Sequence, residues 1–299
     1  MEFNAKVENM NVGSDFQNVN VTLVNGDKKN LKLTDEQARR MVLGKTYHFV
    51  VESFMKDEKE QFKVVSFVGI FDYIQDPVLL KDELRSFYEY APVDMKELKD
   101  SILHYLNSIE NKVLSDITRT IFKQYENSFF MYPAAVRFHH AYIGGLAYHT
   151  KVMLDTAKQF AEIYLYLNKD LLYSGILLHD ICKVDELNGF EGGEYTLEGQ
   201  LIGHLVMASI KVADTAKTLG YEKEEAVLVL NHILLAHHGL PNFGAARKPA
   251  TAEAMLIWYI DTIDSKFTVL GEELEKTQAG DFTQGIAVLD KTRFYKAKI

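Results

Sequence analysis

The stretch LLYSGILLHDICKVDE, residues 171–186, places His179, Asp180 and Lys183 in what otherwise reads as a buried apolar helix. On a helix, adjacent residues point about 100° apart, so His179 and Asp180 can both reach a metal ion that lies beside one edge of the helix. Burying an unpaired carboxylate is very costly, and metal coordination is one of the few ways to compensate for it. The stretch therefore indicates a helical domain built around a metal site.

Histidines and aspartates elsewhere in the chain support this interpretation. Eight of the ten histidines lie between residues 139 and 238: His139, His140, His149, His179, His204, His232, His237 and His238. The segment WYIDTIDSKF adds Asp261 and Asp264 on one face of a second apolar helix. A lone histidine on an apolar helix is more often a core residue than a ligand, but several on successive helices favour a site. Imidazole and carboxylate without thiolate favour a catalytic divalent ion over a structural zinc.

The first 71 residues have a different residue pattern, in which short runs of strand-forming residues dominate. These runs are FNAKVE, VNVTLV (19–24), NLKL (30–33), TYHFVVESF (46–54) and QFKVVSFVGIF (61–71). A short helix is expected after the third run, because Thr34 and Gln37 form a capping-box pattern. The resulting β-β-β-α-β-β order is that of an OB-fold barrel.

After Pro77 the apolar positions recur with a helical period to the end of the chain. We therefore predict an α+β protein of several domains. Residues 1–71 form a small OB-like barrel, residues 72–130 a helical connecting segment, and residues 131–299 an all-α domain that carries the histidines.

Composition sets limits on compartment and partners. The 299 residues are 47% apolar and carry a formal net charge of −9, so a nucleic-acid contact must come from a local patch. The single cysteine, Cys182, excludes disulfides within the chain, and we interpret it as a small packing residue. No signal peptide or membrane span is apparent, so we expect a cytoplasmic protein.

The metal-site residues carry a family resemblance. His149, the pair His179–Asp180, and Asp261 resemble the H…HD…D signature of HD-domain metal-dependent phosphohydrolases. Longer segments resemble the YhaM-type 3′-to-5′ exoribonucleases, in which an OB-fold precedes an HD domain. These segments are YPAAVRFHHAYIGGLAYHT, NKDLLYSGILLHDICKV, YTLEGQLIGH, LLAHHG and AEAMLIWYIDTIDSKF. The resemblance covers residues 90–299 closely and residues 1–71 by element order alone.

The resemblance implies two divalent ions, with manganese as the expected metal. One ion is held by His149, His179, Asp180 and Asp261, and Asp180 bridges to the second. The ligands of that second ion are His204, His237 and His238. Lys183 is expected to contact a phosphate oxygen or to assist the leaving group. The non-functional alternative is that Lys183 is an exposed lysine at the end of a helix.

Four further residues are candidates for substrate contact. His139 and His140 either lie beside the ligands, touch the substrate, or simply pack. Arg247 and Lys248 lie on a loop after the paired histidines, where they either grip a substrate phosphate or are solvated loop charges. Asp264 is expected to support a ligand or to lie on the helix surface, rather than to bind metal itself.

The barrel region has two open interpretations. Tyr47, Phe49 and Val51 share one strand face, and several lysines lie near the turns: Lys28, Lys29, Lys56, Lys59 and Lys63. Aromatic rings for stacking and lysines for phosphates are typical of single-strand binders. They are equally typical of the core and rim of any small barrel.

The predicted function is metal-dependent hydrolysis of single-stranded RNA, with DNA as a further substrate, from the 3′ end to 5′-mononucleotides. Two alternatives stay open: a phosphohydrolase acting on a nucleotide or cyclic dinucleotide, and a non-catalytic nucleic-acid-binding protein. The sequence leaves the oligomeric state undecided, a homo-oligomer included.

Overall fold

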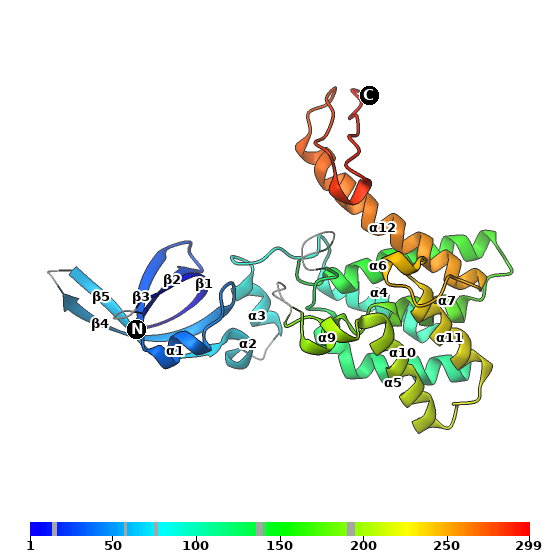
Figure 1. Cartoon of the computed structure of the whole chain (residues 1–299), viewed down its shortest axis with the longest axis horizontal. Helices are drawn as coiled ribbons and strands as arrows, with labels where there is room; N and C mark the ends of the chain where they lie inside the picture. The colour runs from blue at the N-terminus through cyan, green and yellow to red at the C-terminus, as the bar shows by residue number, and fades with distance from the viewer. Residues whose placement is uncertain (14–16, 57–58, 75–76, 136–139, 141, 190–194) are drawn as a thin grey trace. The chain divides into compact units, whose positions relative to one another are not determined.

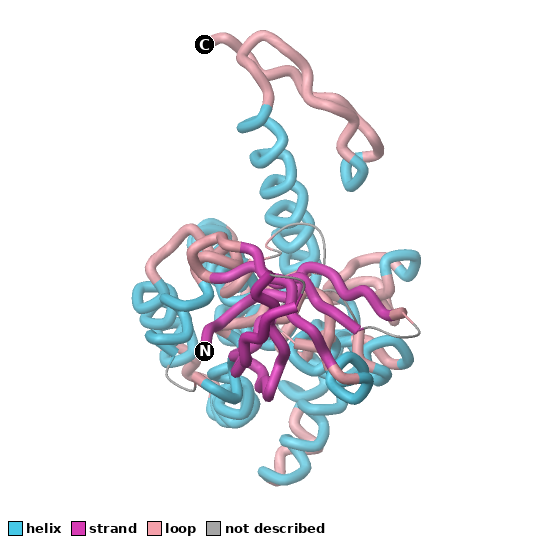
Figure 2. Tube along the Cα trace, turned by 90° about the vertical axis from the view of Figure 1, so that its left-hand side faces the viewer, coloured by secondary structure: helices cyan, strands magenta, loops and turns pink. Residues whose placement is uncertain are grey.

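The structure is a computed structural model that describes residues 1–13, 17–56, 59–74, 77–135, 140, 142–189 and 195–299. The chain divides into two units, Met1–Glu89 and Tyr90–Ile299. All the named strands belong to the first unit, whereas the second is helical (Figures 1 and 2). Each unit is described by itself below.

The first unit is a closed barrel with the strand order β1-β2-β3-β5-β4. Its elements are β1 Glu2–Val12, β2 Gln17–Leu23, β3 Lys28–Leu33, α1 Asp35–Arg40, β4 Thr46–Lys56 and β5 Lys59–Gly69. Strand β1 closes the barrel by pairing antiparallel with β4, and β3 pairs parallel with β5. The predicted OB-like barrel is thus confirmed. Thr34 and Gln37 form the expected capping box at the start of α1.

The barrel core follows from the alternation of apolar residues along the strands. Val19 and Val21 in β2 and Leu31 in β3 are fully buried. Tyr47 and Phe49 of β4 are also buried, so these two rings belong to the core and are not available for stacking on RNA. Between the open interpretations of this strand, the structure therefore favours packing.

Residues 72–130 do not form one separate connecting segment. Helices α2 Ile70–Tyr73 and α3 Pro77–Leu84 lie in the barrel unit, whose last residue is Glu89. Helices α4 Met95–Asn107 and α5 Lys112–Phe129 instead belong to the helical unit. Both carry apolar faces that are buried in its core, among them Ile102 and Ile117. These faces explain the difference, because an amphipathic helix is stable where its apolar stripe is covered.

The helical unit surrounds helix α7 Lys169–His179, which carries the opening motif. Its other elements are α6 Gly145–Ile163, α8 Lys183–Glu186, α9 Leu197–Leu201, α10 His204–Leu219, α11 Glu225–Ala236, η1 Pro241–Phe243, α12 Ala252–Lys276 and η2 Ala287–Leu289. All residues from Leu172 to His179 are buried, because α5, α6, α11 and α12 pack around this helix. The central position of α7 places its C-terminal residues, His179 included, in the packed interior of the unit.

Helix α12 packs with its first half and extends beyond the other helices with its second half (Figures 1 and 2). Its buried residues are Glu253, Ala254, Ile257 and Ile260. Among the described residues, no helix combines the length and the apolar character that crossing a membrane requires.

Candidate metal centre

Four of the predicted ligands meet at the C-terminal end of α7. His149 comes from α6, His179 is the last residue of α7, Asp180 follows it, and Asp261 comes from α12. His149 Nε2 lies 3.3 Å from His179 Nε2 and 3.4 Å from Asp261 Oδ1. His179 Nε2 lies 3.2 Å from Asp180 Oδ2. We call these four residues the first subsite.

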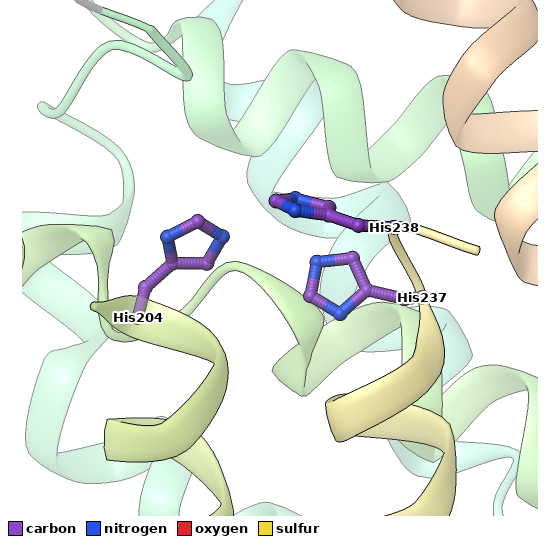
Figure 3. A group of neighbouring side chains, drawn as sticks. All are labelled: His204, His237 and His238. Atoms are coloured by element: carbon purple, nitrogen blue, oxygen red, sulfur yellow. The ribbon is translucent and has the colours of Figure 1, made fainter. Parts of the chain in front are cut away.

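Three further histidines form a second group, two of which lie near the other oxygen of Asp180. His204 begins α10, whereas His237 and His238 follow α11, and Figure 3 shows their rings gathered around one space. His204 Nε2 lies 3.1 Å from Asp180 Oδ1, and His237 Nε2 lies 3.8 Å from the same oxygen. We call this histidine trio the second subsite. Asp180 therefore stands between the two subsites and presents one oxygen to each.

Hydrogen bonds on the far side of the rings fix how these imidazoles face the centre. Nδ1 donates to a backbone carbonyl in His179 (Ile176 O, 2.7 Å), His237 (Leu234 O, 2.8 Å) and His238 (Phe243 O, 2.8 Å). A carbonyl oxygen only accepts, so the Nδ1 atoms carry the protons. The Nε2 atoms are left as lone-pair donors toward the centre, which is the arrangement of metal-binding histidines.

The remaining two rings, His149 and His204, face carboxylates with Nδ1. His149 Nδ1 lies 2.6 Å from Asp264 Oδ2, and His204 Nδ1 lies 2.9 Å from Glu186 Oε2. A carboxylate accepts the ring proton as a carbonyl does, so these rings also present Nε2 to the centre.

The donor atoms at the centre fit divalent cations. Asp180 Oδ1, His204 Nε2 and His237 Nε2 are buried and have no hydrogen-bond partner among the described residues. A buried polar atom without a hydrogen bond lowers the stability of the folded protein by about 1–3 kcal/mol. His149 Nε2 and His179 Nε2 lie 3.3 Å apart, so a positive charge, either a proton or a metal ion, has to be shared between these two nitrogens. Imidazole nitrogens and carboxylate oxygens in this number suit first-row divalent ions.

Electrostatics at the first subsite favour positive charge. Burial alone would lower the pKa of His149, but hydrogen bonds and charge from Asp261 and Asp264 raise it to about 9. At the second subsite, burial and the neighbouring His238 and His179 hold the pKa of His237 well below its ordinary value. His237 is therefore a neutral donor at physiological pH.

Lys183 lies beside the shared carboxylate. Its Nζ donates to Asp180 Oδ2 at 2.7 Å and to Ala134 O at 2.6 Å, and its side chain is 14% exposed. It is therefore not a freely solvated lysine, because two buried acceptors hold its ammonium group. Burial alone would lower the pKa of Lys183, but the charge of Asp180 raises it.

The other candidate residues lie outside the ligand cluster. His140 is buried, with its ring nitrogens on Tyr142 and Asp264, and His139 lies outside the described residues. Arg247 and Lys248 are exposed on the loop before α12.

No hydrogen bond or ion pair within the described part of the chain joins either of these loop cations to the centre. His232 accepts from Ala250 N, away from the cluster. Cys182 is fully buried, and burial raises its pKa to about 12, which fits a packing residue.

Glu186 is a site residue that the sequence analysis did not single out. It lies within the opening stretch and is only 8% exposed. A buried carboxylate just after the HD pair was the available signal, since such a group needs a hydrogen-bonded partner.

Comparisons with known proteins agree with this centre. Residues 146–266 match the HD domain family, a span that contains every residue of both subsites. The chain is 39% identical over 214 residues to the 3′-5′ exoribonuclease YhaM of Bacillus licheniformis, covering 72% of this chain and 68% of that protein. The YhaM proteins of Bacillus pumilus and Bacillus subtilis are also 39% identical, over 74% and 70% of this chain and 70% and 67% of their own lengths.

Proposed function

Because this chain belongs to the YhaM family of 3′-5′ exoribonucleases, we propose that it hydrolyses single-stranded RNA from the 3′ end in a metal-dependent reaction. The observation that carries the proposal is the position of Asp180, which presents one oxygen to each of two histidine groups. A carboxylate so placed suits a two-ion hydrolytic centre.

The ligand sets of the proposal follow the two subsites. His149, His179, Asp180 and Asp261 hold one ion, and Asp180 shares the other with His204, His237 and His238. When bound, such ions lower the pKa of water and neutralise charge on the phosphodiester. Mn²⁺ is the proposed native metal, since carboxylate oxygens suit it and the family resemblance implies it.

Lys183 has two tasks in this proposal. Its hydrogen bond to Asp180 Oδ2 keeps the shared carboxylate oriented between the subsites. An ammonium group has three donors, and two of them are taken by Asp180 and Ala134 O. We propose that the third donor contacts a phosphate oxygen of the RNA. The exposed Arg247 and Lys248 are proposed to attract the strand more loosely.

The outer face of the barrel offers a surface for the RNA strand. Val19 and Val21 point into the core, so Asn20 between them points outward. Asn20 Nδ2 donates to Asn9 Oδ1 at 2.7 Å, and Asn30 Nδ2 donates to Asn20 Oδ1 at 2.6 Å. These three asparagines form an amide row across β1, β2 and β3. Amide groups on the outer face of an OB barrel suit contacts with a nucleic-acid backbone.

Two lysines lie in the next cross-strand row of this face, in which Asn18 of β2 pairs with Lys32 of β3. Lys32 in β3 pairs in register with Lys63 in β5, and Lys32 Nζ lies 5.1 Å from the ring centre of Phe54. A lysine over an aromatic ring, with a second lysine paired in register on the next strand, is typical of single-strand binding surfaces. We therefore propose that the amide row with Lys32, Lys63 and Phe54 binds RNA and feeds it to the centre.

Replacing both Lys32 and Lys63 by glutamine is expected to weaken RNA binding. The slope of log K against log salt concentration should become shallower by about 0.7 for each RNA phosphate that the variant no longer neutralises. The turnover rate at saturating RNA should not change, because the metal centre is untouched. Fluorescence anisotropy of a labelled RNA at several salt concentrations measures this.

The matched control removes two charges from the other unit, by Lys123→Gln with Lys217→Gln in α5 and α10. Both control residues are exposed. Equal weakening by the two double variants would show only a general charge effect and would contradict the proposed surface.

A gel time course on 5′-labelled single-stranded RNA with Mn²⁺ tests the function itself. The proposal predicts a descending ladder of 5′-labelled products and release of 5′-mononucleotides, with a matching DNA strand as a second substrate. RNA that stays intact, while a small phosphodiester is hydrolysed, would instead support a nucleotide phosphohydrolase. RNA that is bound but never cut with any divalent metal would support a non-catalytic binding protein.

A further inference from the structure

Two carboxylates stand directly behind the cluster, one behind each subsite. Among the five ligand histidines, three donate Nδ1 to backbone carbonyls, as described above. The other two, His149 and His204, face Asp264 and Glu186. The first subsite and the second subsite thus each contain one histidine backed by a carboxylate.

Asp264 lies on α12 one turn after the ligand Asp261. Its Oδ2 accepts from His149 Nδ1 at 2.6 Å and from His140 Nε2 at 2.8 Å, and its side chain is only 9% exposed. Within the described ranges of the chain, no hydrogen bond or ion pair joins Asp264 to a ligand of the second subsite.

His140 contacts the same oxygen of Asp264 that accepts from His149. Its Nδ1 lies 2.6 Å from the hydroxyl of Tyr142, so Tyr142, His140, Asp264 and His149 form one hydrogen-bonded row. The backbone of His140 has a φ of 53°, in the left-handed region that non-glycine residues seldom adopt. A buried ring in an uncommon conformation with both nitrogens occupied indicates a support for Asp264. It offers no free group to a substrate.

Glu186 supports the second subsite in the same manner. Its two oxygens lie 3.0 and 2.9 Å from His204 Nδ1, and Oε1 also accepts from the backbone N of His204 at 3.1 Å. The backbone of Glu186 is anchored in turn, since its carbonyl accepts from Thr196 N at 2.9 Å.

We propose that Asp264 and Glu186 are positioning residues that separately set the metal affinity of the first and the second subsite, and that His140 acts through Asp264. This inference rests on the proposed function, because it requires that the cluster binds divalent ions. The physical reason is that a carboxylate behind a histidine fixes the ring orientation and makes Nε2 a stronger donor. Each carboxylate contacts a histidine ring of only one subsite. Loss of either carboxylate should therefore lower the affinity for one of the two ions and leave the other affinity unchanged.

Asp264→Asn and Glu186→Gln test the inference, since both keep the side-chain shape and an accepting oxygen while removing the charge. Calorimetric titration of the metal-free full chain with Mn²⁺ should show two binding events in the wild type. Each variant should lower the Mn²⁺ affinity of a different binding event by about 10- to 100-fold. The affinity of the other event should stay near its wild-type value. Hydrolysis of RNA should recover at high Mn²⁺ concentration, because the ligands themselves are intact.

The matched control is Asp155→Asn on α6, which removes a carboxylate that accepts from the Tyr105 hydroxyl at 2.6 Å. It should leave both binding events unchanged. Melting curves of the metal-free proteins establish that the variants are folded. His140→Asn keeps a residue type that tolerates positive φ and removes the ring, and it should weaken only the event that Asp264→Asn weakens.

Three outcomes would overturn the inference. If the wild type binds Mn²⁺ and both carboxylate variants give its unchanged isotherm, the positioning role is refuted and the proposed function stands. If the wild type binds no Mn²⁺ and leaves RNA intact, the proposed function fails and the inference fails with it. Weakening of both events to the same extent by each variant would refute the separate control of the two subsites.

Discussion

Asp180→Asn is expected to lower the rate of RNA hydrolysis by about 10³-fold or more and to abolish tight binding of one metal ion. The asparagine keeps the shape but turns an NH₂ donor toward one subsite in place of a ligand oxygen. Metal ions contribute several kcal/mol to such reactions, and about 4 kcal/mol corresponds to a factor of 10³ in rate. The remaining amide oxygen can still accept from Lys183, so the fold should persist.

Calorimetry with Mn²⁺ and a gel time course on labelled RNA measure both effects. Asp170→Asn is the matched control, since Asp170 lies at the opposite end of α7 and accepts from the backbone N–H groups of Glu110 and Asn111. This control should keep both metal-binding events and the wild-type rate. An Asp180→Asn protein that binds two ions and digests RNA at the normal rate would refute the bridging role.

Gly239→Ala is expected to destabilise the helical unit by about 2–4 kcal/mol. Gly239 follows the proposed ligands His237 and His238 and has a φ of 75°. A methyl group there would lie 1.9 Å from Cε2 of Trp258, on the helix that carries Asp261. The left-handed conformation costs an alanine about 1 kcal/mol, and forcing the ring away adds about 1–3 kcal/mol. Thermal denaturation should show a melting temperature lower by about 4–16 °C.

Gly220→Ala separates the two parts of this effect. Gly220 ends α10 with a φ of 77°, but a methyl group there would meet nothing within 4 Å among the described residues. Only the conformational cost of about 1 kcal/mol should remain, which lowers the melting temperature by about 2–4 °C. Equal losses in the two alanine variants would show that the contact with Trp258 is unimportant.

Much of the fold follows from local sequence patterns. Alternating apolar residues and the Thr34 capping box were enough to predict the order of elements in the barrel. The HD pair in an apolar helix pointed to metal ligands, because a buried carboxylate needs compensation. The choice of His149 and Asp261 as partners of the HD pair rested on the family resemblance alone. No local pattern could give it, because these two residues meet the pair only through the packing of α6 and α12 on α7.

Other features depend on packing that no local pattern encodes. The spacing of Tyr47 and Phe49 in the sequence is the same whether their rings pack in the barrel core or stack on RNA bases. Only the closure of the barrel shows that the rings are buried in the core. Residues 90–130 read as a connection until their apolar faces are seen in the core of the helical unit. The supporting role of Glu186 becomes visible only when the distance from its carboxylate to the His204 ring is known.

The most direct test of the central claim is removal and return of the metal on the intact protein. Protein stripped with a chelator should leave 5′-labelled single-stranded RNA uncut, and added Mn²⁺ should restore a descending ladder from the 3′ end with release of 5′-mononucleotides. Full digestion by the stripped protein would contradict a metal-dependent centre. Products that shorten from the 5′ end would contradict the proposed direction.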